Sequence, residues 1–445
     1  MNVNVDTQVD KNIDTNENSD IDADTNTNIN VSPTVIKDLG IYIHIPFCVK
    51  KCDYCDFLSA PATDELKKEY LSALLIEIES YRDIMKDYVV PTIFIGGGTP
   101  SCLEAEDIQI ILETICYVFC INTEHLEVTI EVNPGTINRD KLLIYQRAGI
   151  NRLSFGLQSV NNEELKLLGR IHSYEQFKEN YLLAREIGFT NINIDLMSAL
   201  PGQTLSSWEN TLSTVIELNP EHISAYSLIV EEGTKFFEVY SEGKEGYLTL
   251  PDEDTDRLIY QSTKTILESQ GYHRYEISNY AKRGFECKHN SSYWIGTEYL
   301  GLGLGASSLL NGARFNKTHD IKQYIQSSQL YKNDKSSKTS KSWEIDDKSP
   351  EIYDPIGLNE NLEILTKNQR MEEYMFLGLR MSDGISKNAF YQRFLTDIDF
   401  VFGEVFKKLS DSKVIKINGD NIQLTDYGID ISNSVFVNFL INLAQ

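Results

Sequence analysis

Residues 41–57 read IYIHIPFCVKKCDYCDF, and this stretch decides the fold. Its first residues alternate between apolar and other side chains, which predicts a buried strand over Gly40–Ile45. The cysteines Cys48, Cys52 and Cys55 follow on a short loop with the spacing C-x3-C-x2-C. Three thiolates at this spacing can bind three irons of an iron–sulfur cube and leave the fourth iron without a protein ligand. We therefore predict a cluster with one open coordination position at the end of a strand.

A zinc site is the alternative for the same three cysteines. Zinc needs a fourth ligand, which Cys287 or His289 could supply, but the sequence has no second C-x2-C pair of the kind that zinc sites usually carry. Cys116 and Cys120 are four residues apart in an apolar stretch and are predicted to be core residues of a helix. Cys102 is predicted to lie in a turn, and none of the last three is assigned to the metal.

The composition bounds the class of protein. The chain has 445 residues, of which 41% are apolar, so it can bury a large core. Its net charge of −25 and isoelectric point near 4.7 argue against nucleic acid as a partner, because nucleic-acid binders usually present a basic face. No apolar run approaches the roughly 18 residues of a membrane span, and the first residues carry no signal-peptide or transit-peptide pattern. We expect a cytoplasmic protein whose clustered cysteines serve metal chemistry.

From Leu39 onward, β-branched or aromatic runs alternate with helical stretches, which predicts six successive βα units. The predicted strands are Gly40–Ile45, Thr92–Ile95, Glu127–Val132, Arg152–Gly156, Asn191–Met197 and His222–Leu228. The predicted helices are Asp64–Tyr88, Glu104–Val118, Arg139–Ala148, Asn162–Leu168, Tyr174–Ile187 and Leu205–Leu218. Six right-handed crossovers in series give either a doubly wound sheet or an incomplete barrel, and both place ligands at the C-terminal ends of the strands.

Changes of composition divide the chain into five parts. Residues 1–36 are rich in Asn and Asp and are predicted to be a disordered acidic tail. The core occupies residues 37–232, and residues 233–326 are predicted to extend its sheet. Residues 327–365 include a run rich in Lys, Ser and Asp and are predicted to be a linker or insertion. Residues 366–445 are predicted to form a separate C-terminal domain.

The predicted C-terminal domain combines helices with a hairpin. The expected helices are Gln369–Met381, Lys387–Leu395 and Val401–Leu409, and a hairpin over Val414–Leu424 is expected to turn at Asn418-Gly419. Helices followed by a hairpin predict a winged-helix-like α+β fold. Because no basic residues cluster here, an interaction or lid module is favoured over a DNA-binding one.

Three other motifs accompany the cysteine stretch. GGGTP at residues 96–100 follows the second predicted strand, where glycines let a backbone approach a ligand closely. EVNPGT at residues 131–136 and FGLQS at residues 155–159 follow the next two strands. In this combination the sequence closely resembles the radical S-adenosylmethionine (radical SAM) enzymes of the oxygen-independent coproporphyrinogen III oxidase-like group. The resemblance is close over residues 39–310 and looser in the C-terminal domain.

Within that group the chain is most similar to the HemW haem (heme) chaperones. The oxidases of the group carry a further cysteine two positions after the third cluster ligand, where this chain has Phe57. HemW proteins carry the motif His-Asn-x-x-Tyr-Trp, which residues 289–294 match as HNSSYW. They also tend to have Asn in the motif at residues 131–136, where the oxidases have Asp. All three differences point the same way.

The resemblance implies a partial (β/α)6 TIM-like barrel in which Cys48, Cys52 and Cys55 hold a 4Fe-4S cluster. The open iron would bind the amine and carboxylate of S-adenosylmethionine, and one electron from the cluster could cleave its sulfonium bond to give a 5′-deoxyadenosyl radical. Haem is the third implied ligand. His289 is the candidate for a haem-related role, because neutral imidazole is a common axial ligand of haem iron. His44, which precedes the cysteine loop, is predicted to pack against that loop.

Eight residues are carried over as contacts of S-adenosylmethionine. The resemblance implies that Tyr42 lies beside the cofactor and that Gly97, Gly98 and Thr99 hold its methionine amine. It implies that Glu131 and Asp195 bind hydroxyl or ammonium groups, and that Gln158 and Arg170 bind polar or carboxylate groups. Two alternatives stay open from the residues themselves: Gln158 as a satisfied core amide, and Arg170 as a surface cation.

Two classes of function follow from the resemblance. The first is a haem chaperone that binds haem and delivers it to client proteins such as respiratory enzymes, with no catalytic residue assigned. The second is an oxygen-independent coproporphyrinogen III oxidase, which would use the radical to abstract hydrogen from a propionate side chain. Phe57 and the motif at residues 289–294 favour the chaperone. A radical SAM enzyme acting on RNA is a third alternative, which the acidity disfavours. The resemblance also allows a homodimer and transient membrane contact.

Overall fold

The structure of the protein is a computed structural model, and it describes residues 37–121, 124–241, 243–244, 249–333, 341–342 and 353–440. The predicted acidic tail therefore lies outside the described residues. Among the described helices, none is long and apolar enough to cross a membrane.

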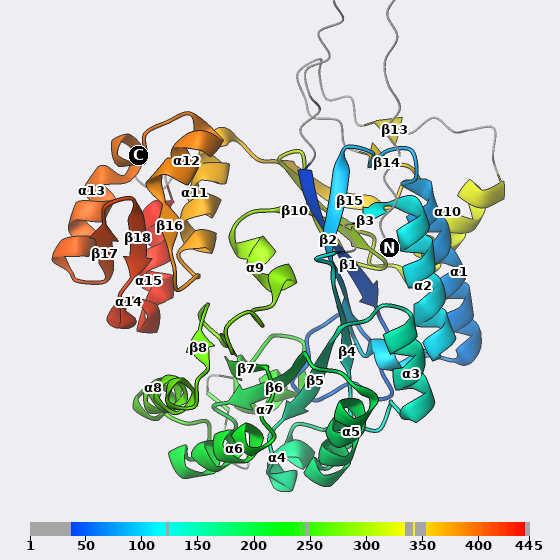
Figure 1. Cartoon of the computed structure of the whole chain (residues 1–445), viewed down its shortest axis with the longest axis horizontal. Helices are drawn as coiled ribbons and strands as arrows, with labels where there is room; N and C mark the ends of the chain where they lie inside the picture. The colour runs from blue at the N-terminus through cyan, green and yellow to red at the C-terminus, as the bar shows by residue number, and fades with distance from the viewer. Residues whose placement is uncertain are drawn as a thin grey trace, which may run out of the picture. The chain divides into compact units, whose positions relative to one another are not determined.

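A large curved sheet forms the centre of the molecule (Figure 1). Its strands are β1 (Lys37–Ile45), β2 (Tyr88–Gly97), β3 (Cys120–Ile121), β4 (Glu127–Val132), β5 (Arg152–Gln158), β6 (Ile192–Ser198), β7 (His222–Ser227), β8 (His273–Arg274), β9 (Asn279–Ala281), β10 (Glu298–Leu302), β11 (Ser307–Leu310), β12 (Ala313–Lys317) and β15 (Asn359–Ile364). Over the described residues the order is β15-β12-β11-β10-β1-β2-β4-β5-β6-β7-β9-β8, with β3 beside β2.

The six strands from β1 to β7, leaving out the short β3, are parallel and follow one another in sequence order. A doubly wound sheet would reverse its strand order at a switch point, so the sequential order identifies a barrel-like sheet. The two ends of the order, β15 and β8, do not pair with each other within the described part of the chain, and the barrel is open. The predicted fold class, a partial (β/α)6 barrel, is confirmed.

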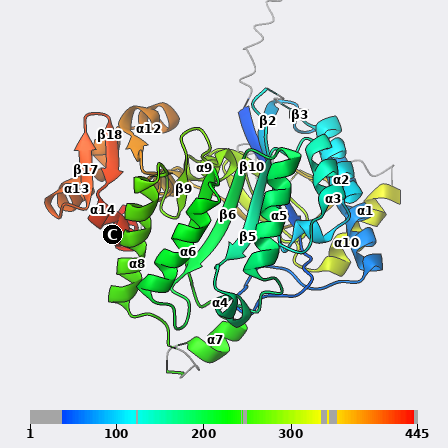
Figure 2. The same ribbon diagram turned by 60° about the horizontal axis from the view of Figure 1, so that its bottom comes forward.

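Helices cover the outer face of the sheet, as Figures 1 and 2 show. They are α1 (Asp64–Ser80), α2 (Ala105–Val118), α3 (Arg139–Arg147), α5 (Tyr174–Ile187), α6 (Leu205–Glu217) and α8 (Glu253–Ser269). The short helices α4 (Asn162–Leu167) and α7 (Lys235–Tyr240) lie at the end of the barrel, beside the cysteine loop. Several begin at a side chain that caps a free backbone N–H, such as Thr63 before α1 and Ser173 before α5. Their apolar faces pack on alternate residues of the strands, and Ile41, Ile43 and Ile45 of β1 are fully buried.

One predicted helix is too long. The helix expected over Asp64–Tyr88 ends at Ser80, and Tyr88 already belongs to β2. Strand β2 pairs with β1 through a register shift opposite Asp38 and Gly40, and Pro91 lies at this irregularity, where its missing N–H is tolerated. The apolar run before the expected strand was therefore part of the strand itself.

Further strands continue the sheet beyond β1. Strand β10 pairs parallel to β1, and β11, β12 and β15 continue the sheet as antiparallel neighbours. The region from 327 to 365, predicted to be a linker, contains more regular structure than expected. Helix α10 (Ile321–Asn333) runs into it, β15 completes the sheet at its end, and the short β13 (Lys341–Ser342) pairs with β14 (Tyr353–Asp354). Its polar composition concealed α10 and β15, because both have exposed side chains.

The C-terminal region has its own core and small sheet. Its elements are α11 (Lys367–Gly378), β16 (Ile385–Ser386), α12 (Lys387–Phe394), α13 (Ile398–Asp411), β17 (Ile415–Asn418), β18 (Asn421–Leu424), α14 (Asp426–Asp430) and α15 (Ser432–Phe436). The strands pair in the order β16-β18-β17 over an aromatic core that includes Phe390, Phe402 and Phe406. The predicted hairpin is confirmed, but it turns at Gly419 and Asp420, one residue later than expected.

Cys116 and Cys120 are exposed, so the prediction that they are core residues is wrong. Helix α2 buries the face that carries Ile108, Ile111 and Ile115. Cys116 follows that face by one position, which turns its side chain by about 100° around the helix. Cys120 is not helical, because it lies in β3.

Candidate functional site

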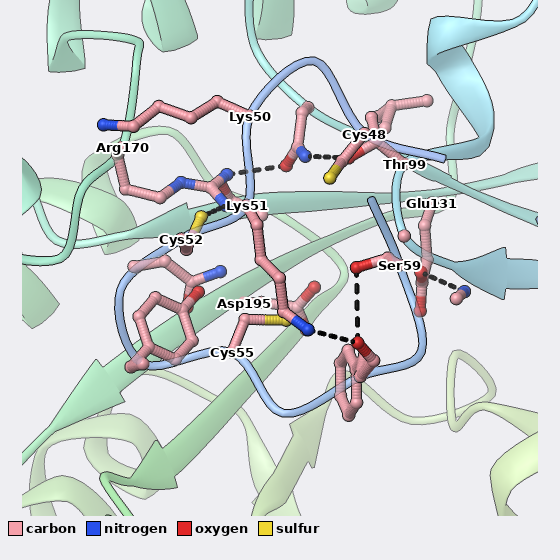
Figure 3. A pocket seen from close by; sticks show the side chains of 18 of the residues that line it. Cys48, Lys50, Lys51, Cys52, Cys55, Ser59, Thr99, Glu131, Arg170 and Asp195 are labelled. Atoms are coloured by element: carbon pink, nitrogen blue, oxygen red, sulfur yellow. Dashed lines mark hydrogen bonds between the residues drawn. The ribbon is translucent and has the colours of Figure 1, made fainter. Parts of the chain in front are cut away.

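The three cysteines of the loop after β1 line one cavity of about 130 Å³. In Figure 3 the loop curves round this cavity, with Arg170 and Glu131 on opposite sides. Burial raises the pKa of the thiols of Cys48 and Cys55. The cavity also takes residues from the C-terminal ends of β2, β4, β5 and β6, which is where a barrel of this kind places its ligands.

The donor set suits an iron–sulfur cluster better than zinc. Among the described residues, no group of three His, Cys, Asp or Glu side chains is close enough to hold a single metal ion. The thiolates of a 4Fe-4S cube bind three separate irons, so they stand farther apart than ligands that share one ion. Cys287 and His289, the possible extra zinc ligands, do not line the cavity, and Cys287 is buried beside Glu127 instead. Neither residue is placed to serve as the fourth ligand of a zinc ion bound by the three cysteines.

Contacts on both sides of Asp53 fix the course of the cysteine loop. The N–H of Asp53 donates to the carbonyl oxygen of Leu168, and the N–H of Phe236 donates to the carbonyl oxygen of Asp53. Lys235 forms an ion pair with the Asp53 carboxylate at 2.7 Å. The loop is thereby held between the turn after α4 and the start of α7, although both lie far away in the sequence.

The glycine turn after β2 clamps the beginning of the cysteine loop. The N–H of Gly98 donates to the carbonyl oxygen of Ile45, and the N–H of Thr99 donates to that of Phe47. A side chain at residue 98 would collide with the carbonyl group of Phe47, which explains the need for glycine. Gly97 has a φ of +112° and also lacks room for a side chain. The methionine amine of S-adenosylmethionine, as an ammonium group, needs hydrogen-bond acceptors and not donors. The N–H groups that form this clamp are therefore not needed to bind the amine at this turn.

Two carboxyl groups, Glu131 at the end of β4 and Asp195 on β6, face the cavity. Burial, and secondarily the charge of Asp195, raises the pKa of Glu131 to about 8. Glu131 accepts the N–H of Gly97 at 3.1 Å, and Asp195 accepts hydrogen bonds from Ser154 and Asn193. Burial also raises the pKa of Asp195. A cationic or hydroxyl-bearing ligand would compensate both carboxyl groups.

Arg170 is a cavity residue, and the alternative of a surface cation is wrong. Its Nη1 lies 3.5 Å from Cys52 Sγ, and its Nη2 donates to Asn133 Oδ1 and to the carbonyl oxygen of Gly156. Asn133 in turn donates to Thr99 Oγ1 at 2.6 Å. The sequence interpretation missed Asn133, although it stands in the motif at 131–136 directly after a strand, and that position was the available signal.

Gln158 lines the cavity from an unusual backbone conformation. Its φ is +75°, and the pairing of β5 with β6 shifts register between Gly156 and Gln158. A non-glycine residue in this region is strained, and such strain is found most often where a side chain must be aimed at a ligand. A contact with a ligand would account for the strained backbone of Gln158, whereas the alternative of a core amide would not.

Tyr42 and His44 lie on the face of β1 opposite its buried isoleucines. The Tyr42 hydroxyl and His44 Nδ1 are 3.0 Å apart, and His44 Nε2 is 2.8 Å from the carbonyl oxygen of Leu58. His44 thus packs against the end of the cysteine loop, as predicted. Tyr42 does not line the cavity itself, although its pKa is raised by burial and by the nearby Glu131.

His289 is enclosed in the inner face of the barrel on helix α9 (Lys288–Trp294). Its side chain is 1% exposed, its Nδ1 is 2.9 Å from Thr92 Oγ1, and its Nε2 is 2.9 Å from the Tyr293 hydroxyl. The ring stacks on Phe94, and burial lowers its pKa to about 3. Both ring nitrogens have partners, so a metal could bind His289 only after one of these contacts opens.

Most of the predicted cofactor residues come together. Those that line the cavity with the three cysteines are Gly97, Gly98, Thr99, Glu131, Gln158, Arg170 and Asp195. Phe57, at the position where the oxidases carry a cysteine, lines the same cavity and is 60% exposed.

Comparison with known proteins agrees with this geometry. The family description "Radical SAM superfamily" matches residues 42–215, and "HemN C-terminal domain" matches residues 365–431. The solved structure of coproporphyrinogen III oxidase (HemN) from Escherichia coli, described as a radical SAM enzyme, is similar with a TM-score of 0.73 and 25% identity. That match covers 91% of this chain and 90% of the oxidase. The fold and the cavity thus define a radical SAM protein, a class that implies a 4Fe-4S cluster and S-adenosylmethionine.

The relatives in sequence narrow the class. The chain is 37% identical to "Heme chaperone HemW" of Bacillus subtilis over 90% of this chain and 98% of that protein. It is 35% identical to the protein of the same name in Lactococcus lactis, over 90% of this chain and 97% of that protein. The chain belongs to the HemW family.

Proposed function

We propose that the protein is a haem chaperone, which binds haem and passes it to client proteins such as respiratory enzymes. The observation that carries the proposal is the 37% identity to a heme chaperone over nearly the full length of both proteins. The HNSSYW motif at residues 289–294 and Phe57 beside the cysteines add support from this chain's own residues. The proposed place of action is the cytoplasm, with contact to the membrane only when a client lies there.

The cavity residues have a defined part in this proposal. When bound, a 4Fe-4S cluster and S-adenosylmethionine supply one-electron chemistry at a sulfonium group. Cys48, Cys52 and Cys55 would hold the cluster. The glycine turn, Glu131 and Asp195 would bind the cationic and hydroxyl groups of the cofactor. Gln158 would take polar groups.

A coproporphyrinogen III oxidase is the second candidate, because the solved structure reported above as similar belongs to such an enzyme. Phe57 argues against it. This residue lines the cavity where the oxidases have a further cysteine, and a phenyl ring cannot provide a thiol for proton, hydrogen or metal chemistry.

The test compares both activities in one preparation. The full chain is reconstituted with its cluster under anaerobic conditions and supplied with S-adenosylmethionine, a reductant and coproporphyrinogen III, and haem binding is followed in parallel by absorption. We expect saturable haem binding and no decarboxylation, and the Cys52→Ala variant, which removes a cluster ligand, serves as the cluster-free control. Decarboxylation at about 1 s⁻¹ or faster, the range of ordinary enzymes, would overturn the chaperone proposal.

A further inference from the structure

We propose that haem binds in a second cavity, formed by β7, α8, α9 and the C-terminal region, and is not held through His289. This inference rests on the proposed haem-binding function. The cavity has a volume of about 770 Å³, compared with about 130 Å³ for the cysteine cavity. Sites for ligands of this molecular size are typically about 300–1,000 Å³.

The walls of the second cavity suit the flat, apolar faces of a porphyrin. Tyr226 of β7, Tyr260 of α8 and Trp294 of α9 contribute aromatic rings, and Ile229 and Ile277 contribute aliphatic surface. Ile229 is 69% exposed, an unusual position for a large apolar side chain beside a cavity. Aromatic and aliphatic walls with a few polar groups are the usual composition of a cofactor site.

One end of the cavity offers donors for a carboxylate. The Arg380 guanidinium lies over the indole ring of Trp294, 4.4 Å from its centre. Arg380 Nε and Trp294 Nε1 are buried and have no hydrogen-bond partner in the described structure. Unpaired buried donors are costly, but neither atom is open to the cavity, so a carboxylate would gain a charge-assisted hydrogen bond to them only after the side chains of this wall shift. The two propionate groups on one edge of haem are acceptors of this kind.

The carboxylates of the same cavity already have hydrogen-bond partners or a compensating charge. Glu276 accepts hydrogen bonds from the N–H of Ser278 and from the Asn279 amide; burial raises its pKa, and the nearby charge of Arg380 opposes that shift, so Arg380 also compensates Glu276. Asp256 accepts the Ser227 hydroxyl, and Asp430 accepts the Gln261 amide. Glu253 lies in the first turn of α8, where the helix dipole compensates negative charge. These contacts reduce the repulsion that a propionate would meet.

The two cavities are neighbours across the pair β6 and β7. Asp195, which lines the cysteine cavity, pairs in register with Ser224, two residues before Tyr226 of the second cavity. Asp195 is close enough to contribute to the raised pKa of Tyr226. Haem in the second cavity would therefore lie next to bound S-adenosylmethionine, which gives the radical SAM site access to its cargo.

The lining residues include no histidine, cysteine or methionine in the described part of the chain, so tyrosine is the side chain available to the iron. His289 lies behind Tyr293 and already uses both ring nitrogens. Haem binding would then depend on Arg380 and Trp294 and not on the imidazole.

The test titrates the full chain with two probes, hemin and hemin whose propionates are esterified. Arg380→Gln removes the charge, Arg380→Lys keeps it, and Trp294→Phe removes only the indole N–H. Arg147→Gln, on α3 and outside the cavity, is the matched control. We expect Arg380→Gln to weaken hemin binding about tenfold or more, the loss of one charge-assisted hydrogen bond, and to leave the esterified probe unaffected. Arg380→Lys should recover part of the affinity, and circular dichroism checks the fold of each variant.

The outcomes separate this inference from the function on which it rests. In one outcome the wild type binds hemin and Arg380→Gln and Trp294→Phe bind it equally well; in another, only His289→Gln loses binding. Either result overturns the second cavity as the site and leaves the chaperone proposal standing. An equal loss of both probes in Arg380→Gln also overturns the proposed contact with the propionates. No saturable hemin binding to the wild type overturns the haem-binding function, and the inference falls with it.

Discussion

Arg170 Nη1 lies 3.5 Å from Cys52 Sγ, although the two residues are 118 positions apart in the sequence. The same guanidinium holds Asn133 and the carbonyl oxygen of Gly156, so it joins the cysteine loop to the ends of β4 and β5. A cation next to a cluster ligand favours the more negative, reduced state of the cluster.

Arg170→Gln should therefore lower the reduction potential of the reconstituted cluster. Loss of a contact worth about 1.4 kcal/mol corresponds to about 60 mV for one electron. An anaerobic redox titration followed by electron paramagnetic resonance measures the shift, with Arg147→Gln as a control that keeps every cavity residue. A potential equal to that of the wild type would mean that Arg170 does not act on the cluster.

Gly98→Ala should displace the cysteine loop. The added methyl group would meet the carbonyl group of Phe47, whose position is fixed by the N–H of Thr99. Overpacking against backbone costs about 1–3 kcal/mol, so we expect a lower unfolding free energy and poor cluster incorporation. The control is Gly403→Ala, because a methyl group there meets nothing within 4 Å. Iron content and chemical denaturation give the two readouts; normal iron incorporation in Gly98→Ala would contradict the proposed clamp.

Glu131 should make the apoprotein less stable as the pH rises. Burial, with Asp195 second, raises its pKa to about 8, so the folded chain keeps a proton that the unfolded chain loses near pH 4.5. The stabilisation is complete below that pH and is lost as the pH rises through 8. Glu131→Gln stays neutral at every pH. The difference in unfolding free energy between this variant and the wild type should therefore shift by about 2–4 kcal/mol in favour of the variant from pH 5 to pH 9.

Urea unfolding at pH 5, 7 and 9 measures this difference, with the exposed Glu179→Gln as the control. Parallel pH profiles for wild type and Glu131→Gln would show that the carboxyl is ionised throughout this range.

His289 should have the opposite pH dependence. Burial, and then Arg152, lowers its pKa to about 3, so the folded chain keeps the ring neutral while the unfolded chain protonates it below about pH 6.5. Its stabilising contribution is present above pH 6.5 and is lost as the pH falls toward 3. His289→Gln should lose stability at pH 7, by about 1–3 kcal/mol for the disrupted contacts with Thr92 and Tyr293, and much less at pH 4. Thermal unfolding across this range checks the crossover; a constant difference would indicate a solvated ring.

The sequence predicted the parts of the fold that depend on local pattern. Alternating apolar residues located β1, and the motifs at strand ends located the cavity, because parallel strands bring their C-terminal ends together. The end of α1 was missed because Tyr81, Ile84, Met85 and Tyr88 continue a helical spacing of apolar residues, although the chain forms turns there. Cys116 was misplaced because an apolar helix has a boundary between buried and exposed positions that only packing decides.

The pairings that complete the site are long-range and were not readable from the sequence. The position of Asn133 after a strand was visible in the sequence, but its contacts with Thr99 and Arg170 were not. The enclosure of His289 depends on Thr92, nearly 200 residues earlier, and a motif at 289–294 carries no sign of it. Sequence motifs identified the residues of the cysteine cavity. The three-dimensional contacts moved the proposed haem site from His289 to the second cavity.

The most direct test of the account is an absorption titration of the cluster-loaded wild-type protein with hemin. A haem chaperone should show saturable binding of one haem per chain with a dissociation constant of about 1 μM or below, which corresponds to about −8 kcal/mol. A non-saturating, linear increase in hemin absorption up to a large excess would contradict the central claim that this protein carries haem.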